Sequence, residues 1–544
     1  MLLISSAVIL ICLFANLGAL GLVGPDEPRY VWIARDMAQT HDWITPRLYG
    51  QPWFEKPPLY YWAGAVGFLL HLPAEWAARL PSALAALAIA LALGWLGWRH
   101  YERSRSVWSP CLLAPLLFST SASAIGFARS AAPDMLFSAT LTLAMASAAS
   151  ALRRRGALRS ADDAEIGSRS GDLLPLLVFG VFLGLAALAK GPAAVLLAGG
   201  AIGIWAVVTR QWRAAFRIAH PLAIAAFCVV ALPWYVACAR RNPEFLRVFI
   251  LEHNFERYLT PLYQHRQPFW FFIPVVLLAL FPWTVLLGPV AQEAMLLWRE
   301  GRFKDSPCFF FGCWAIFPVV FFSFSQSKLP GYVLPAIPPL CLLCAVAAIR
   351  SMKAARQGGG NTSRTITQGL GLTWFIAGVA LLFSARRLSV GAPDESHLHA
   401  IVMAGGAAAV LAGIFMAGLL ANRKSYLAVP LCLLCVAAGV EFLNLGVLPA
   451  VDSRYSARSY AELLRSDLRP ERIFTYQLPR AWSWGLAFYF KRELPEWIPS
   501  DPEPGLTLTT DAGFEDIKKS GRFHGELDEP EGGIRLVPIE AAPH

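Results

Sequence analysis

The sequence predicts a polytopic α-helical membrane protein with a small α/β domain at its C-terminal end. Of its 544 residues, 56% are hydrophobic and only 15% are charged, whereas soluble chains carry about 25% charged residues. Uncharged runs of about 18–23 residues, long enough to cross a bilayer, recur between residues 2 and 447. Short clusters of Arg and Lys separate these runs, as expected for the cytoplasmic loops of a membrane protein.

The charge and cysteine patterns exclude other classes of protein. The net charge of +10 is spread over the clusters between apolar runs, which argues against a nucleic-acid partner. Most of the ten cysteines lie inside apolar runs and suggest small packing residues rather than a disulfide framework. No Lys or Arg precedes the apolar run 2–23, so we expect an uncleaved first helix rather than a secretory signal.

Charge placement predicts thirteen spans, with the N-terminus cytoplasmic and the C-terminal region on the outer, periplasmic side. The apolar segment 58–71 is short and rich in Tyr and Trp, so we expect it to be interfacial or re-entrant. The predicted spans are 2–23, 76–98, 109–126, 134–151, 173–189, 191–208, 219–239, 269–290, 308–324, 330–349, 368–386, 398–421 and 425–447.

Two domains follow from this pattern: a transmembrane catalytic domain, 1–448, and a soluble periplasmic domain, 449–544. Within the outer loop 24–75, apolar and charged residues alternate at helical spacing over 28–40, which predicts an amphipathic helix on the membrane surface. In the soluble domain we expect one helix over 451–468 and strands over 472–477 and 506–510.

Acidic residues interrupt the apolar sequence where the chain is expected to meet the outer side. Asp26 and Glu27 follow the first apolar run, and Asp134 opens a later one. Each acid taken alone has a simple explanation. Water at the interface would solvate Asp26 and Glu27, and the helix dipole would stabilise Asp134 at the start of its helix. Two outer-end acids on separate spans can also converge as a general base and a positioning carboxylate. We predict the second role.

Basic residues at the same predicted level indicate an anionic lipid substrate. Lys56 lies between Glu55 and two prolines, where a cation at headgroup depth is placed to hold a lipid phosphate. Taken singly, such cations are more often surface charges that snorkel to the interface. Together they predict a positively charged face, and its other members are Lys190, Arg257, Arg266 and Lys328.

Two further features remain open from the sequence. His253 and His265, with Glu55 and Glu252, include the ligand types that zinc prefers, although their spacing matches no compact zinc motif. A divalent metal near Glu55 and His253 is therefore a secondary prediction. Tyr332 suits either an aromatic belt at the interface or the lining of the site.

Taken in order, these motifs resemble the bacterial ArnT/protein O-mannosyltransferase group of GT-C glycosyltransferases. The likeness covers most of residues 1–350. Within the group, the sequence is similar in particular to the transferases that move aminoarabinose from undecaprenyl phosphate to lipid A. The segments that carry it are 26–30, 50–57, 77–82, 129–135, 190–192, 252–257, 268–270 and 328–332.

The resemblance implies a GT-C fold of thirteen transmembrane helices with juxtamembrane helices in the first outer loop. It implies Asp26 as the principal catalytic residue with Asp134 as its partner, and we add the adjacent Glu27. Lys56 and Arg257 would hold the donor phosphate, Tyr332 would line the pocket, and Glu55 with His253 would hold any metal. We expect Arg29, Lys190 and Lys328 to contribute to substrate binding.

The expected function is an inner-membrane glycosyltransferase whose partners are a polyprenyl-phosphate sugar, an envelope acceptor such as lipid A, and membrane lipids. Transfer to protein or envelope hydroxyls is the alternative within this class. A lipid flippase or transporter is the alternative from another class, and it requires ionisable groups near the bilayer midplane. The charges here gather at one boundary, which favours an enzyme.

Overall fold

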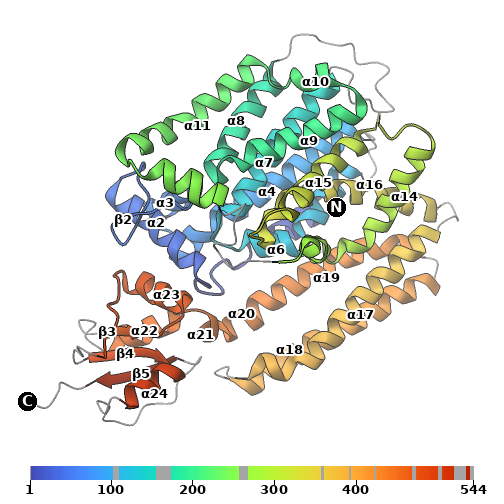
Figure 1. The fold of residues 1–544 in the computed structure, drawn as a ribbon. Helices are drawn as coiled ribbons and strands as arrows, with labels where there is room; N and C mark the ends of the chain where they lie inside the picture. The colour runs from blue at the N-terminus through green and yellow to red at the C-terminus, as the bar shows by residue number, and fades with distance from the viewer. Residues whose placement is uncertain are drawn as a thin grey trace, which may run out of the picture.

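The computed structural model describes residues 2–101, 109–154, 173–256, 267–304, 306–356, 361–390, 394–421, 424–467, 473–499, 505–519 and 534–539. Within these ranges the chain forms a large helical bundle, with a small sheet-containing unit at one end (Figure 1).

Every predicted span overlaps a helix or a pair of helices. The single helices are α1 (Leu2–Phe14), α4 (Ala74–His100), α7 (Pro133–Arg154), α8 (Leu174–Lys190), α9 (Ala193–Thr209), α11 (Pro221–Arg241), α15 (Pro307–Ser323), α16 (Ile337–Arg356), α17 (Asn361–Ser389), α18 (Glu395–Ala421) and α19 (Ala428–Phe442). The pairs are α5 (Pro110–Ser119) with α6 (Ala122–Ala128), and α13 (Phe272–Ala279) with α14 (Leu287–Arg299). Shorter helical segments complete this part of the chain: α10 (Trp212–Phe216), η2 (Arg247–Glu256), η3 (Phe269–Phe271), η4 (Trp283–Leu286), η5 (Pro330–Ala336), η6 (Ser425–Leu427), η7 (Leu443–Val447) and α20 (Leu448–Ala450).

The described residues hold seven helices long and apolar enough to cross a membrane, or nine if each bent pair is one span. Four of the other predicted spans, α1, α8, α9 and α15, are shorter apolar helices. The structure thus confirms a polytopic helical membrane protein, while the count of thirteen spans stays a prediction. The segment predicted as one straight span over 269–290 bends by 105°, at a break that contains Pro282, whose ring cannot continue a helix.

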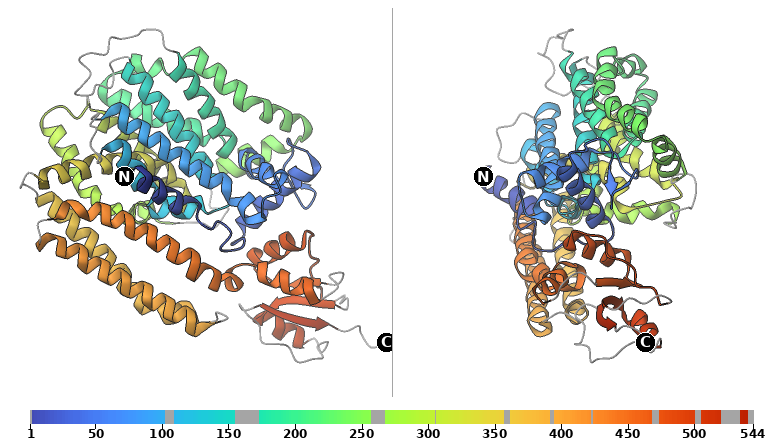
Figure 2. Two further views of the ribbon diagram at one scale, coloured as in Figure 1. Left: turned by 180° about the vertical axis from the view of Figure 1, so that it is seen from behind. Right: turned by 90° about the vertical axis from the view of Figure 1, so that its left-hand side faces the viewer.

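Helices in lipid associate through close packing, because apolar surface alone does not drive their association there. Small residues at the contacts let the helices of the bundle approach closely. Helices α17 and α18 lie side by side along their length (Figures 1 and 2). A Cβ built on Gly378 would lie 2.6 Å from the carbonyl oxygen of Gly406, and one on Gly413 would lie 2.6 Å from that of Gly371. Side chains at these positions would force the two helices apart.

The segment 24–75, predicted as the first outer loop, contains α2 (Asp26–Thr40), the β1–β2 hairpin (Arg47–Leu48 and Gln51–Pro52) and α3 (Leu59–Leu69). The helix predicted over 28–40 exists, while its position at the membrane surface stays a prediction. Ten of its residues are buried, because α3 and the C-terminal unit both pack against it. The helix therefore lies in the interior of the protein.

The C-terminal unit is a three-stranded sheet with four helices, as an α/β domain was predicted. Strand β3 (Ile473–Tyr476) pairs in parallel with β4 (Gly505–Thr510), and β4 pairs antiparallel with β5 (Ile534–Ile539). The predicted helix over 451–468 is instead two helices, α21 (Asp452–Tyr455) and α22 (Arg458–Asp467). Strand β5 and the helices α23 (Arg480–Phe490) and α24 (Asp511–Lys519) were not predicted. The domain boundary at residue 449 remains a prediction.

Candidate active site

An ionic chain joins the start of α2 to the loop before α3. Arg29 Nη2 lies 2.5 Å from Asp26 Oδ1 and 3.0 Å from Glu55 Oε2. The other oxygen of Glu55, Oε1, lies 3.3 Å from Lys56 Nζ. The structure thus brings four of the predicted residues together in one alternating row of acids and bases.

Local sequence fixes this row in place. Asp26 is the first residue of α2, where the helix dipole favours a carboxylate. Lys56 directly precedes two prolines, and Pro58 is the N-cap of α3, so the backbone that presents Lys56 has little freedom. The side chains of Glu55 and Lys56 are only 10% and 15% exposed.

Asp26 is the open member of the row, with 59% of its side chain exposed. Crowding by surrounding protein atoms raises its pKa above the ordinary value, although the neighbouring Arg29 opposes this shift. The negative charges of Glu55 and Asp134 raise the pKa further, and Lys56 lowers it. The charge of Asp134 thus reaches Asp26, while their convergence as a catalytic pair stays a prediction.

Asp134 forms a second ion pair at the meeting point of α7, α8 and η5. Its Oδ1 accepts a hydrogen bond of 2.6 Å from Lys190 Nζ, and that Nζ also lies 5.0 Å from the centre of the Tyr332 ring. A Cβ on Gly331 would lie 2.5 Å from Asp134 Oδ1, so glycine is required for this approach. Lys190 thus contacts both Asp134 and Tyr332, and all three were predicted site residues.

Glu27, although adjacent to Asp26, is buried at 5% exposure and does not face the same surroundings. Its carboxylate accepts hydrogen bonds from Arg79 Nη2 at 2.8 Å, from the Val23 amide at 2.9 Å and from the Ala131 amide at 2.7 Å. The last bond ties the start of α2 to the loop that precedes Asp134. Glu27 thus has the contacts of a positioning residue, whereas we had predicted a catalytic one.

Of the remaining predicted cations, Lys328 is the one that the structure describes. Lys328 is buried and donates to the carbonyls of Ser325 and Gln267 at 2.5 and 3.1 Å, contacts typical of a residue that stabilises its loop. Arg257, Arg266 and His265 lie outside the described residues. Two of the three described members of the predicted positive face, Lys56 and Lys190, are paired with carboxylates.

Glu55 and His253 both line a cavity of about 570 Å³ between the β2–α3 loop and the start of η2. Within the described ranges, no group of three or more His, Cys, Asp or Glu side chains is placed to hold a metal ion. Both Glu55 oxygens are moreover engaged by Arg29 and Lys56. The metal at Glu55 and His253 gains no support from this geometry.

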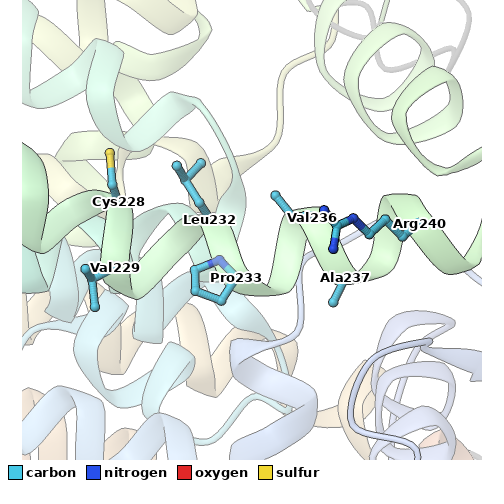
Figure 3. Close-up of a pocket in the computed structure, with 7 residues that line it drawn as sticks. All are labelled: Cys228, Val229, Leu232, Pro233, Val236, Ala237 and Arg240. Carbon is cyan, nitrogen blue, oxygen red and sulfur yellow. The ribbon is translucent and has the colours of Figure 1, made fainter.

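A second hollow, of about 440 Å³, lies along α11 (Figure 3). It is lined by apolar side chains around Pro233, and Arg240 is its one charged member. None of the predicted site residues lines this recess.

Three residues of the site escaped prediction. Arg79 lies in a segment that contributes to the resemblance, and the available signal was that it is the single charged residue of the predicted span 76–98. Trp53 and Trp484 contribute rings whose centres lie 5.5 and 5.2 Å from Arg29 Cζ. Trp484 belongs to the C-terminal unit, where no sequence pattern linked it to the acids.

The fold and this site define a multi-pass α-helical membrane protein with paired acids and cations gathered where several helices begin or end. Comparisons with known proteins identify its family. Residues 1–249 match the family model described as dolichyl-phosphate-mannose-protein mannosyltransferase. The Pseudomonas aeruginosa (strain UCBPP-PA14) undecaprenyl phosphate-alpha-4-amino-4-deoxy-L-arabinose arabinosyl transferase is 31% identical over 72% of this chain and 67% of its own length. The chain therefore belongs to the ArnT/protein O-mannosyltransferase family of GT-C glycosyltransferases.

Other relatives agree. The protein of the same name from Edwardsiella ictaluri is 32% identical, but the alignment spans 59% of this chain and 54% of the relative. The crystal structure of ArnT from Cupriavidus metallidurans bound to undecaprenyl phosphate superposes with a TM-score of 0.74, covering 100% of this chain and 99% of that one at 23% identity. This likeness extends the shared fold to the C-terminal unit.

Proposed function

We propose that this protein transfers a sugar from a polyprenyl phosphate carrier, with undecaprenyl phosphate–aminoarabinose as donor and lipid A phosphate as acceptor. The observation that carries the proposal is the row of Asp26, Arg29, Glu55 and Lys56 beside the Asp134–Lys190 pair. The names of the relatives, which specify undecaprenyl phosphate and 4-amino-4-deoxy-L-arabinose, support the donor. We further propose the bacterial inner membrane as the location, with the site and the C-terminal unit on the periplasmic face.

The cations of the row suit a phosphate leaving group. In the transfer, the acceptor oxygen forms a bond to the anomeric carbon of the sugar while the bond from that carbon to the lipid phosphate breaks. The departing phosphate then carries the developing negative charge. Lys56 would leave Glu55 to contact it, an electrostatic stabilisation of the kind enzymes use most. Arg29 Nε and Trp53 Nε1 are buried without a hydrogen-bond partner in the described part of the chain, so both can donate to a ligand.

The role of Asp26 depends on the acceptor. A phosphate acceptor is already ionised, so Asp26 would orient the acceptor or the sugar amine without moving a proton. A hydroxyl acceptor must lose its proton, and Asp26 would then accept it as a general base. Its exposed position and raised pKa suit either role. Transfer to protein or envelope hydroxyls is the second candidate function, favoured by the match to the protein mannosyltransferase model.

The test is a transfer assay with purified protein, undecaprenyl phosphate–aminoarabinose and lipid A, in which mass spectrometry detects the addition of the sugar to lipid A. We expect transfer by the wild type and a large loss in Asp26→Asn. Asp36→Asn, a carboxylate near the other end of α2, is the matched control and should remain active. Transfer only from another polyprenyl-phosphate sugar, or only to a hydroxyl acceptor, would move the assignment to the second candidate. Lipid translocation without transfer from any donor would refute both.

A further inference from the structure

The C-terminal unit is docked on the outer loop through its helix α23, which lies beside α2 in Figure 1. Arg35 of α2 donates a hydrogen bond of 2.8 Å to the carbonyl oxygen of Phe488, and its guanidinium carbon lies 4.3 Å from the centre of that ring. Arg35 is itself buried. The contact between α2 and α23 therefore includes a buried hydrogen bond and a buried cation–π contact.

A second anchor holds the same helix to the membrane-embedded part. Tyr489 donates a hydrogen bond of 2.8 Å to Glu75 of α4 and accepts one of 2.9 Å from the amide of Leu22. Nearby, Asp452 accepts a hydrogen bond of 2.7 Å from the amide of Gly21. Two adjacent residues of α23 thus bind two different parts of the bundle, which leaves the helix little freedom to turn or slide.

Trp484 lies one helical turn before Phe488 and therefore on the same face of α23. Its ring centre is 5.2 Å from Arg29 Cζ, and the ring of Trp53 approaches the same guanidinium at 5.5 Å. The Arg29 side chain is only 10% exposed, and its Nη2 holds both Asp26 and Glu55. An aromatic face attracts such a cation most strongly when water is excluded.

We propose that Trp484 is a positioning residue of the active site, supplied by the C-terminal domain, which holds the Arg29 guanidinium in the orientation that links Asp26 to Glu55. The inference rests on the proposed function and gives the C-terminal domain a part in the chemistry. Without the indole face, water would hydrate Arg29 and the guanidinium would be free to leave its two carboxylates. Asp26 would then lose its orientation toward the sugar.

The test compares Trp484→Leu with Trp484→Phe in the transfer assay, because leucine keeps an apolar side chain but has no aromatic face. For Trp484→Leu we expect a fall in kcat of about five- to thirtyfold and a change in KM below about twofold. Trp484→Phe should stay within about threefold of the wild type. The control is Trp482→Leu on the same helix, since Trp482 packs against Tyr460 inside the C-terminal unit. It should leave transfer unchanged.

A double-mutant cycle of Arg29→Met and Trp484→Leu on the unfolding equilibrium in detergent tests the contact without reference to activity. We expect a coupling of about two- to thirtyfold in the equilibrium constant. Equal kcat in Trp484→Leu and Trp484→Phe would overturn the proposal, as would absence of coupling. A wild-type chain that transfers no sugar would instead refute the proposed function, and the cycle would still report whether Trp484 binds Arg29.

Discussion

Replacing Glu27 by alanine should destabilise the protein far more than replacing its neighbour Asp26. The side chains of Glu27 and Arg79 are 6% and 4% exposed, and removing one partner of a buried ion pair costs about 3–5 kcal/mol. The amides of Val23 and Ala131 would also lose their acceptor. Arg79 would keep its bonds to the backbone carbonyls of Leu17, Leu20 and Gly21, which limits the loss, so we expect about 3–4 kcal/mol.

The assay is equilibrium unfolding of the detergent-solubilised protein, followed by circular dichroism. Arg79→Met should cost a similar amount, because it leaves the Glu27 carboxylate buried without its cation. The double variant should be less destabilised than the sum of the two, since no unpaired charge remains. A loss below about 1 kcal/mol in Glu27→Ala, the range of an exposed pair, would refute the reasoning. So would strict additivity in the double variant.

Four further predictions concern the charged residues of the site. Asp26→Asn should reduce transfer to a hydroxyl acceptor at least about a hundredfold, but transfer to a phosphate acceptor much less, as rates with the two acceptors would reveal. Because the folded pKa of Asp26 is raised, the folded chain binds more protons than the unfolded chain between the two pKa values. The associated stability is present below the unfolded pKa and lost as pH rises through the folded pKa. At pH 7 the wild type has therefore lost this stability, and Asp26→Asn should melt no lower than the wild type. A lower melting temperature would contradict this. Lys56→Met should raise the KM for the polyprenyl-phosphate donor about tenfold in steady-state kinetics by removing a charged hydrogen bond, and an unchanged KM would remove Lys56 from the donor site. Lys190→Met should lower kcat/KM about ten- to a hundredfold by leaving Asp134 without its cation, whereas full activity would make that pair dispensable.

The sequence alone determined the class of fold because hydrophobic length is a local property. An uncharged run long enough to cross a bilayer forms a helix within the membrane, since the backbone must satisfy its own hydrogen bonds there. The ends of such runs also marked Asp26 and Asp134, which the structure brings within electrostatic reach of each other. The bend of 105° within the segment expected as one span was not evident, because composition does not report the direction of a helix.

Only the tertiary structure decided what the neighbouring acids Asp26 and Glu27 do. Successive residues of a helix point in different directions, so one carboxylate stays open while the other enters a buried pair with Arg79. The place of Trp484 was equally undetermined, because its contact with Arg29 depends on how a separate unit docks on α2. Docking depends on the shapes and polar groups of surfaces that exist only once both parts have folded, and no local pattern in the sequence encodes it.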